Sequence, residues 1–412
     1  MKDCQVKDTE IRTYAEEDLT AMLDRLENEG ANKATLEQKM FSYLERRARN
    51  KGVPIKGTFE LTPLCNLDCK MCYVHLTPSQ MLQSNRCMIS TARWKQIMQD
   101  AIDHGMIYAL LTGGEALLHP DFDELYLFLC EHGVQVKVNT NGLLLTADRI
   151  DFFRQHPPAE LHITLYGADE DTYERVTGHR VFGRVWQNIL AARDAGIRLC
   201  VGITPSKYIQ NALVSVVNML RAAGVRYGIN SALSDPREET GRAGIEHDMS
   251  VAEYIQLHKQ LRMMSGAEVK PVRMEDVPQP GGNITEEQRG FRCGGGRSSF
   301  SVVWYGSMQP CLTVGNIQAD LRTLPFAQAW AHVFKSVSEY PVPRECFGCP
   351  YEGFCTVCVE RHALGAPVGH ANPALCERAK RFYQEGLTST QQQIDVGSKN
   401  DEDEKSVFDP ES

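Results

Sequence analysis

The stretch Thr62-Pro63-Leu64-Cys65-Asn66-Leu67-Asp68-Cys69-Lys70-Met71-Cys72 follows an apparent strand, and its three cysteines have the spacing C-x3-C-x2-C. Three thiolates so closely spaced can close on one face of a small iron–sulfur cube. A [4Fe–4S] cluster normally takes four thiolates, so three would leave one iron open to a ligand from outside the chain. The alternatives are three unrelated cysteines or a zinc site that lacks its fourth ligand, although structural zinc sites close with four.

The length and charge of the chain narrow its class. Its 412 residues exceed one typical core, so we expect one large domain with smaller ones beside it. The opening residues have no apolar segment of a secretory signal, and no run of about 18 apolar residues occurs, which predicts a cytoplasmic protein outside the membrane. The net charge of −9 disfavours a nucleic-acid partner, which would require a basic stripe.

The cysteine content points to metal ligands. Fourteen cysteines in a chain without an export signal are more readily ligands than disulfides, because the cytosol keeps thiols reduced. Ten fall in two groups, and the other four are expected to be small buried apolar residues. Those four are Cys4, Cys87, Cys130 and Cys200.

A second group of seven cysteines lies toward the C-terminal end of the sequence. Its members are Cys293, Cys311, Cys346, Cys349, Cys355, Cys358 and Cys376. Two four-iron clusters require eight thiolates by ligand counting, and this group supplies seven. Paired C-x2-C units are also the spacing of zinc ribbons, so zinc stays open as an alternative for this group alone.

Strands and helices alternate through the first half of the chain, which predicts an α/β fold with a parallel sheet and crossover helices. We expect strands near 57–62, 108–112, 135–139, 160–165, 198–203 and 226–231, and a hairpin at 300–309 that turns at Gly306. Residues 15–52 are predicted to be helical, as are residues 250–264. The charged run 235–242 is expected to be a mobile loop over the mouth of the sheet, with Arg237 and Arg242 carrying solvated charge or, alternatively, contacting substrate.

These features together resemble radical S-adenosylmethionine (SAM) enzymes. In barrel-type folds the chemistry lies at the C-terminal ends of the strands, where this cysteine loop and the sequence Leu111-Thr112-Gly113-Gly114-Glu115 both fall. The second of these resembles the family's Gly-Gly-Glu motif. The resemblance implies a partial (β/α)6 TIM-like barrel, in which the open iron of the cluster chelates the amino and carboxylate groups of SAM. Reductive cleavage of SAM then gives a 5'-deoxyadenosyl radical.

The resemblance also implies individual cofactor contacts. The Gly-Gly-Glu motif would receive the methionine amino group, and Thr164 would lie near the carboxylate. Met71 replaces a residue that is often aromatic in the family, but its backbone can still meet the adenine. The implied cofactor-binding residues are Met71, Gly113, Gly114, Glu115, Asn139, Thr164 and Ile203, and no catalytic base is identified.

The second cysteine group resembles the SPASM extension of these enzymes, which carries auxiliary [4Fe–4S] clusters. The family pattern would complete one cluster with Cys346, Cys349, Cys355 and Cys376. It would leave Cys293, Cys311 and Cys358 to hold a second cluster, with or without an open iron. The family places three residues between the cysteines aligned with Cys355 and Cys358, and this chain has two, which leaves the assignment of Cys358 open.

Five segments follow from these patterns. They are an N-terminal helical segment (1–52), the radical SAM partial barrel (53–235), a helix and linker (236–290), a small Cys-rich SPASM domain (291–380) and an acidic, disordered tail (381–412). Residues 401–412 alone hold six acidic residues and one Lys, as in a solvated tail.

The leading hypothesis is a maturase of a ribosomally made peptide that forms a thioether or carbon–carbon crosslink. The resemblance implies a peptide or protein substrate and an electron donor of the flavodoxin or ferredoxin type. Recognition of the leader peptide is expected from the N-terminal helices or, alternatively, from a separate leader-peptide-binding protein. Sulfatase-maturing relatives usually place an acidic residue directly after the cysteine matching Cys311, and this chain has Leu312. Four alternatives stay open. They are sulfatase maturation, haem- or quinone-cofactor maturation, a non-catalytic iron–sulfur carrier or sensor, and a zinc-stapled interaction protein.

Overall fold

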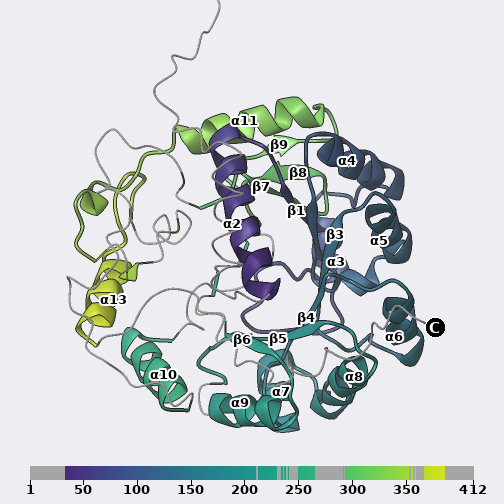
Figure 1. Cartoon of the computed structure of the whole chain (residues 1–412), viewed down its shortest axis with the longest axis vertical. Coiled ribbons are helices and arrows are strands. Elements are labelled where there is room, and N and C mark those ends of the chain that lie inside the picture. Colours follow the sequence, from purple (N-terminus) through teal and green to yellow (C-terminus); the bar gives the residue numbers. More distant parts are fainter. Residues whose placement is uncertain are drawn as a thin grey trace, which may run out of the picture.

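The computed structural model describes residues 33–209, 212–229, 233–234, 236–237, 240, 249–264, 291, 293–351, 354–355, 358 and 366–385. The start of the predicted N-terminal helix, the linker, Arg242 and the acidic tail lie outside these residues. The described residues form one sheet of nine strands, with helices in a ring around it (Figure 1). No helix among them is long and apolar enough to cross a membrane.

The strand order across the sheet is β6-β5-β4-β3-β2-β1-β7-β8-β9. Strands β1 to β6 pair in parallel, and this confirms the partial (β/α)6 barrel in an α/β fold. The strands are β1 (Lys56–Glu60), β2 (Tyr108–Thr112), β3 (Gln135–Thr140), β4 (Glu160–Thr164), β5 (Leu199–Ile203), β6 (Tyr227–Ile229), β7 (Ser299–Val302), β8 (Ser307–Gln309) and β9 (Ala319–Asp320).

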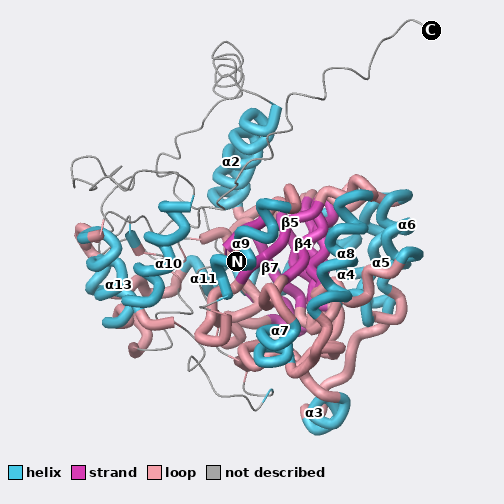
Figure 2. The backbone as a smooth tube through the Cα atoms, turned by 90° about the horizontal axis from the view of Figure 1, so that it is seen from below, coloured by secondary structure: helices cyan, strands magenta, loops and turns pink. Residues whose placement is uncertain are grey.

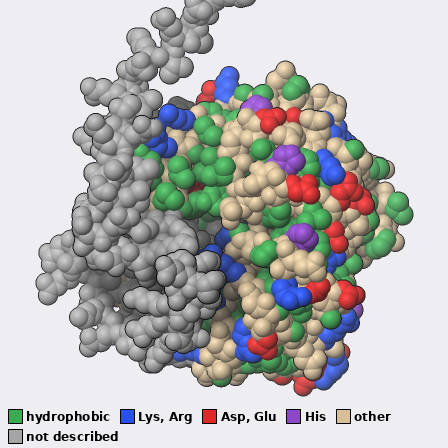
Figure 3. All heavy atoms as spheres, turned by 45° about the vertical axis from the view of Figure 1, so that its right-hand side comes forward, with side chains coloured by type: hydrophobic (Ala, Val, Ile, Leu, Met, Phe, Trp, Pro, Cys, Tyr) green, Lys and Arg blue, Asp and Glu red, His purple; other side chains and the backbone are tan. Residues whose placement is uncertain are grey.

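Most helices lie in the ring around the sheet, whereas α2 (Lys33–Lys51) lies across its middle in the view of Figure 1. The other described α-helices are α3 (Pro78–Gln83), α4 (Thr91–Asp103), α5 (Phe122–Glu131), α6 (Ala147–Gln155), α7 (Glu170–Thr177), α8 (Phe182–Asp194), α9 (Leu213–Ala222), α10 (Val251–Met264), α11 (Phe326–Ser338) and α13 (Pro373–Gln384). Helices α2 and α3 stand at opposite ends of the strands (Figure 2). Charged side chains of both signs are interspersed on the face in Figure 3.

Helix α4 illustrates how the sequence sets this packing. Its cap is Ser90, whose side chain accepts a hydrogen bond from the Arg93 N–H. Trp94, Ile97, Met98 and Ala101 recur at helical spacing and are buried against the sheet. Burial of each of the larger side chains contributes roughly 1.5–3 kcal/mol, so this face fixes the helix on the barrel.

Successive residues of β1 face opposite sides of the sheet. Phe59 faces the helix layer, where its ring centre lies 6.1 Å from that of Trp94 and 5.9 Å from that of Phe300. Glu60 is the next residue, so its side chain faces the barrel interior, where it is fully buried. The barrel interior therefore holds a buried carboxylate at the last residue of its first strand.

The predicted hairpin turns at Gly306, where φ is +85°, but it does not belong to a separate sheet. Strand β7 pairs in parallel with β1, so the C-terminal part of the chain extends the barrel sheet. Strand β8 is antiparallel to β7 and therefore runs back toward the edge where β1 begins. Cys311 leaves the sheet at that amino edge, while the first cysteine loop leaves β1 at the carboxyl edge.

Candidate iron–sulfur and cofactor sites

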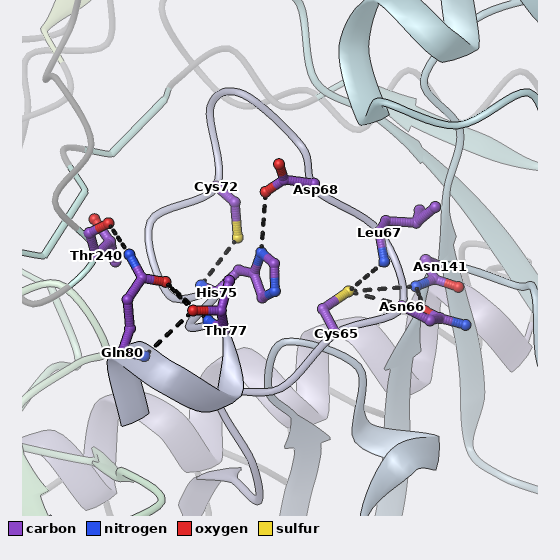
Figure 4. Close-up of polar contacts among 10 residues, drawn as sticks. All are labelled: Cys65, Asn66, Leu67, Asp68, Cys72, His75, Thr77, Gln80, Asn141 and Thr240. Atoms are coloured by element: carbon purple, nitrogen blue, oxygen red, sulfur yellow. Dashed lines mark hydrogen bonds and ion pairs between the residues drawn. The ribbon is translucent and has the colours of Figure 1, made fainter. Parts of the chain in front are cut away.

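The loop of Cys65, Cys69 and Cys72 is held by main-chain hydrogen bonds. The Asp68 and Lys70 N–H groups donate to carbonyls at the end of α7, each at 3.0 Å. Two sulfurs accept from the loop itself: Leu67 N donates to Cys65 Sγ at 3.4 Å, and His75 N donates to Cys72 Sγ at 3.3 Å (Figure 4). Amide donors aimed at sulfur favour the thiolate, which is the form that binds iron.

Asn141, which follows β3, joins this loop to the next strand end. Its Nδ2 donates to Asn66 Oδ1 at 2.6 Å and lies 3.6 Å from Cys65 Sγ (Figure 4). Its backbone N–H donates to Glu115 Oε2 at 2.7 Å. Burial raises the pKa of the Cys65 thiol to about 12, while the Asn141 and Leu67 donors act in the opposite direction. Iron must therefore displace a proton from Cys65 when it binds.

The glycines of the Gly-Gly-Glu motif bring two backbones together. Gly114 N donates to Thr62 O at 2.8 Å, and Glu115 N donates to Leu64 O at 2.9 Å. A Cβ on Gly114 would lie 2.4 Å from the Leu64 carbonyl oxygen, and one on Gly113 would lie 2.4 Å from that of Thr62. Only glycine permits this approach, so the motif clamps the start of the cysteine loop.

The Glu115 carboxylate is buried and faces protein donors. Oε1 accepts from Leu117 N and Thr140 Oγ1, and Oε2 accepts from Asn141 N. Burial raises the pKa of this carboxyl group, and these three hydrogen bonds act against the rise. Oε2 retains a lone pair that could accept a further donor, so the predicted contact with an amino group stays a prediction.

Thr164 and two glycines form one row across neighbouring strands. Thr164 is the register partner of Gly202, which is the partner of Gly228, so all three lie on the same side of the sheet. The space beside Gly202 on this face is taken by the His162 ring, whose Nε2 lies 2.2 Å from where a Gly202 Cβ would stand. Sequence reasoning missed this row, although Gly202 was visible beside Ile203.

Two other predicted contacts lie away from this row. Ile203 follows Gly202, so its fully buried side chain faces the helix layer and only its backbone can meet a ligand in the barrel. Asn139 is the register partner of His162 and lies one layer below Asn141. The buried Met71 is part of the hydrophobic core.

Tyr166 is a further residue that sequence reasoning missed. Burial raises the pKa of its hydroxyl far above the usual range, and the hydroxyl also hydrogen-bonds the Cys69 thiol. Each cysteine of the loop therefore has a neighbouring polar group: Asn141 at Cys65, Tyr166 at Cys69 and the His75 N–H at Cys72. Tyr166 follows the predicted Thr164 by two residues, which is the signal that could have found it.

The second cysteine group forms two neighbourhoods. Burial and, after it, the nearby thiols of Cys355, Cys376 and Cys349 raise the pKa of Cys346 to about 12. Burial likewise raises the pKa of Cys293, with Cys311 as a nearby thiol. The assignment of these cysteines and of the half-buried Cys358 to two ligand sets stays a prediction.

The donor sets fit four-iron clusters. All ten candidate ligands are thiols rather than disulfides. Within the described part of the chain, no three His, Cys, Asp or Glu side chains converge as the ligands of one metal ion would. The thiolates of a four-iron cube each bind a different iron and need not converge on one point.

Comparison with known families agrees with this geometry. Residues 59–208, from β1 to the loop after β5, match the Radical SAM superfamily. Residues 59–208 therefore carry a Radical SAM domain, and this family implies one [4Fe–4S] cluster and SAM.

Individual relatives are distant. The antilisterial bacteriocin subtilosin biosynthesis protein AlbA of Bacillus subtilis (strain 168) is 23% identical over 317 residues, which are 74% of this chain and 67% of that protein. The AdoMet-dependent heme synthase of Methanosarcina barkeri (strain Fusaro / DSM 804) is 24% identical over 324 residues, covering 74% of this chain and 90% of that protein. The crystal structure of Streptococcus suis SuiB bound to precursor peptide SuiA shares the fold, with a TM-score of 0.61, 14% identity and 87% of each chain covered.

Proposed function

We propose that this enzyme modifies a ribosomally made peptide by hydrogen abstraction, forming a thioether or carbon–carbon crosslink. The observation that carries the proposal is the position of the two cysteine sites at opposite edges of one barrel. The loop of Cys65 to Cys72 lies at the carboxyl edge of β1, and Cys293 and Cys311 lie at the amino edge of β7. A peptide segment between them would have one site on each side. The likeness to AlbA and to the fold of peptide-bound SuiB supports a peptide substrate.

In this proposal Cys65, Cys69 and Cys72 hold the first cluster, which together with SAM supplies the radical chemistry when bound. Asn141 orients Cys65 and the Glu115 carboxylate at once. Thr164 positions the carboxylate of SAM, and the backbone of Ile203 meets its adenine. Because these groups sit at rigid strand ends, the target hydrogen can be held close to the reacting carbon, which is where the protein contributes to the rate.

The C-terminal cysteines would hold two auxiliary clusters. Cys346, Cys349, Cys355 and Cys376 would complete one, and Cys293, Cys311 and Cys358 would hold the other. An open iron in the second would suit a substrate thiolate. A reduced flavodoxin or ferredoxin would supply the electron for SAM cleavage, and a separate protein would present the leader peptide.

A second candidate function is modification of a haem-precursor tetrapyrrole. The AdoMet-dependent heme synthase relative supports it, because the match covers 90% of that protein. The Cys-rich second group favours the peptide substrate, since an auxiliary iron can bind a cysteine of the peptide.

The test uses anaerobically reconstituted, dithionite-reduced enzyme with SAM and a short Cys-containing peptide encoded beside its gene. We expect 5'-deoxyadenosine together with a peptide that has lost one pair of hydrogens. Enzyme with all three cysteines of the first loop changed to alanine is the control and should give neither product. Formation of 5'-deoxyadenosine with an unchanged peptide and a converted tetrapyrrole would establish the second candidate instead.

A further inference from the structure

Arg237 forms a buried, bidentate ion pair with Glu60. Its Nη1 lies 2.8 Å from Glu60 Oε1, and its Nη2 lies 2.8 Å from Glu60 Oε2. The Glu60 side chain is 1% exposed and that of Arg237 is 16% exposed. The sequence expectation of solvated charge at Arg237 was therefore wrong. The physical reason is the carboxylate at the end of β1, which could not stay ionised in the barrel interior without a partner.

The same arginine contacts both cysteine-bearing segments. Its backbone N–H donates to Tyr73 O at 3.1 Å, and its Cζ lies 5.7 Å from the centre of the Tyr73 ring. Its Nη2 also donates to Leu312 O at 2.9 Å. Tyr73 directly follows Cys72, and Leu312 directly follows Cys311. One guanidinium group therefore joins β1, the first cysteine loop and the segment after β8.

Tyr73 lies in the space between the two sites. Its ring faces the Arg237 guanidinium, whose Cζ lies 5.7 Å from the ring centre, and Nη2 of the same guanidinium donates to Leu312 O at 2.9 Å. The first loop leaves the carboxyl edge of the sheet and Cys311 leaves the amino edge, so Tyr73 and Arg237 span the barrel interior between them.

The segment that carries Arg237 is itself anchored. Thr240 donates to Arg237 O from its backbone at 2.9 Å and from its hydroxyl at 2.7 Å. Gln80 of α3 donates through Nε2 to Thr240 O at 2.9 Å, and its other amide atom takes part in the capping box with Thr77 (Figure 4). Arg237 is thus held at both its backbone and its guanidinium group.

We propose that Arg237, anchored on Glu60, is a positioning residue that fixes the segment of Cys311 against the loop of Cys72, with Tyr73 between them. This clasp (Arg237, Glu60, Tyr73 and Leu312) sets the spacing between the first cluster and the auxiliary cluster, and so couples SAM cleavage to peptide modification. The proposal rests on the proposed function for its substrate. Lysine cannot replace the arginine, because an ammonium group lacks the planar fork that contacts both carboxylate oxygens and the Leu312 carbonyl together.

The experiment compares reconstituted wild-type enzyme with Arg237→Lys and with the double variant Glu60→Gln, Arg237→Gln. The double variant leaves no unpaired buried charge, so it can test the proposal if the Arg237→Lys variant does not fold. Arg154→Gln is the matched control, because Arg154 of α6 forms an exposed pair with Asp151. The measurements are SAM molecules cleaved per peptide modified, spin relaxation of the reduced clusters, and hydrogen exchange of the loaded protein.

We expect both clasp variants to raise the number of SAM molecules cleaved per peptide product by about tenfold, because small misplacements are costly at a reacting centre. Exchange should quicken together around Tyr73 and Leu312, and the relaxation of one cluster by the other should change. The Arg154 variant should match the wild type in all three. The proposal is overturned if both clasp variants cleave as many SAM molecules per modified peptide as the wild type. It is also overturned if hydrogen exchange quickens around only one of Tyr73 and Leu312. If wild-type enzyme cleaves SAM but modifies no peptide, the proposed function fails, and exchange and relaxation still decide the clasp.

Discussion

The two cysteine regions are held in place by different means. The loop of Cys65 to Cys72 is hydrogen-bonded to the ends of β2 and α7 through its main chain, and Gly114 presses against its first turn. Cys346 belongs to a small separate apolar cluster whose other buried member, among the described residues, is Ala371. There Glu345 accepts from His370 Nδ1 and from Ala371 N, each at 2.9 Å.

This difference indicates how much the folding of each cysteine region depends on iron. The barrel site is built by backbone contacts that exist without iron, so a cluster should enter a largely preformed loop. The described residues around Cys346 and Ala371 pack in a small cluster of their own, so iron binding should contribute much of their folding free energy. Four predictions follow from this contrast, from the largest expected effect to the smallest.

The largest effect should come from removing a ligand in the preformed loop. Cys69→Ala leaves two thiolates, which cannot hold the first cluster with one open iron, so 5'-deoxyadenosine formation should fall below detection. Cys87→Ala is the control, because Cys87 is an exposed thiol outside both groups. Chromatographic measurement of 5'-deoxyadenosine decides the outcome, and wild-type cleavage by the Cys69 variant would refute the role of this loop.

A methyl group at Gly114 should break the backbone clamp. The added Cβ would lie 2.4 Å from Leu64 O and 2.6 Å from Pro63 O, so we expect Gly114→Ala to cost about 1–3 kcal/mol and to lower iron incorporation. Thermal unfolding of the iron-free protein measures the cost. Gly315→Ala is the control, since the nearest atom to its Cβ is 3.9 Å away. Equal unfolding temperatures for the two variants would show that the clamp does not hold the loop.

Iron removal should separate the two regions. Without iron, hydrogen exchange should quicken at residues 344–350 and 373–384 while residues 56–64 and 108–115 keep their protection, because only the barrel is held by its own sheet. Mass spectrometry of peptic fragments measures this. Equal loss of protection in both regions would mean that the barrel site also depends on its cluster.

The smallest expected effect is a difference in iron incorporation between alanine variants of Asn139, in β3, and of Asn141, just after β3. Asn141→Ala removes the donors to Asn66 and Cys65 and should cost about 1–3 kcal/mol. Asn139→Ala is the matched change one layer lower and should affect iron incorporation less. Colorimetric iron content of the two variants checks the order, and a larger loss at Asn139 would reverse our assignment.

The sequence predicted much of the fold because its short strands alternate with helices whose buried residues recur at helical spacing. All six parallel strands and the hairpin at Gly306 lie within a few residues of their expected positions. The pairing of β7 with β1 was not predicted, because nothing local in residues 299–302 indicates a partner more than 200 residues earlier.

Site residues within a contiguous sequence motif could be predicted. Those whose role depends on the face of the sheet on which the side chain lies could not. The cysteine loop and the Gly-Gly-Glu motif were visible as short patterns. Choosing between Asn139 and Asn141, or between Gly202 and Ile203, needs the strand register, because a shift of one residue reverses the face. The partner of Arg237 lies 177 residues away, and only the folded barrel brings it to Glu60.

The central claim is that Cys65, Cys69 and Cys72 hold a four-iron cluster with one iron open to SAM. Electron–nuclear double resonance of the reduced enzyme with SAM labelled by ¹⁵N at its amino group and ¹⁷O at its carboxylate tests this most directly. The account predicts hyperfine coupling from both labels to the cluster, and loss of both couplings in Cys69→Ala. A reduced cluster in the wild-type enzyme that shows neither coupling would contradict it.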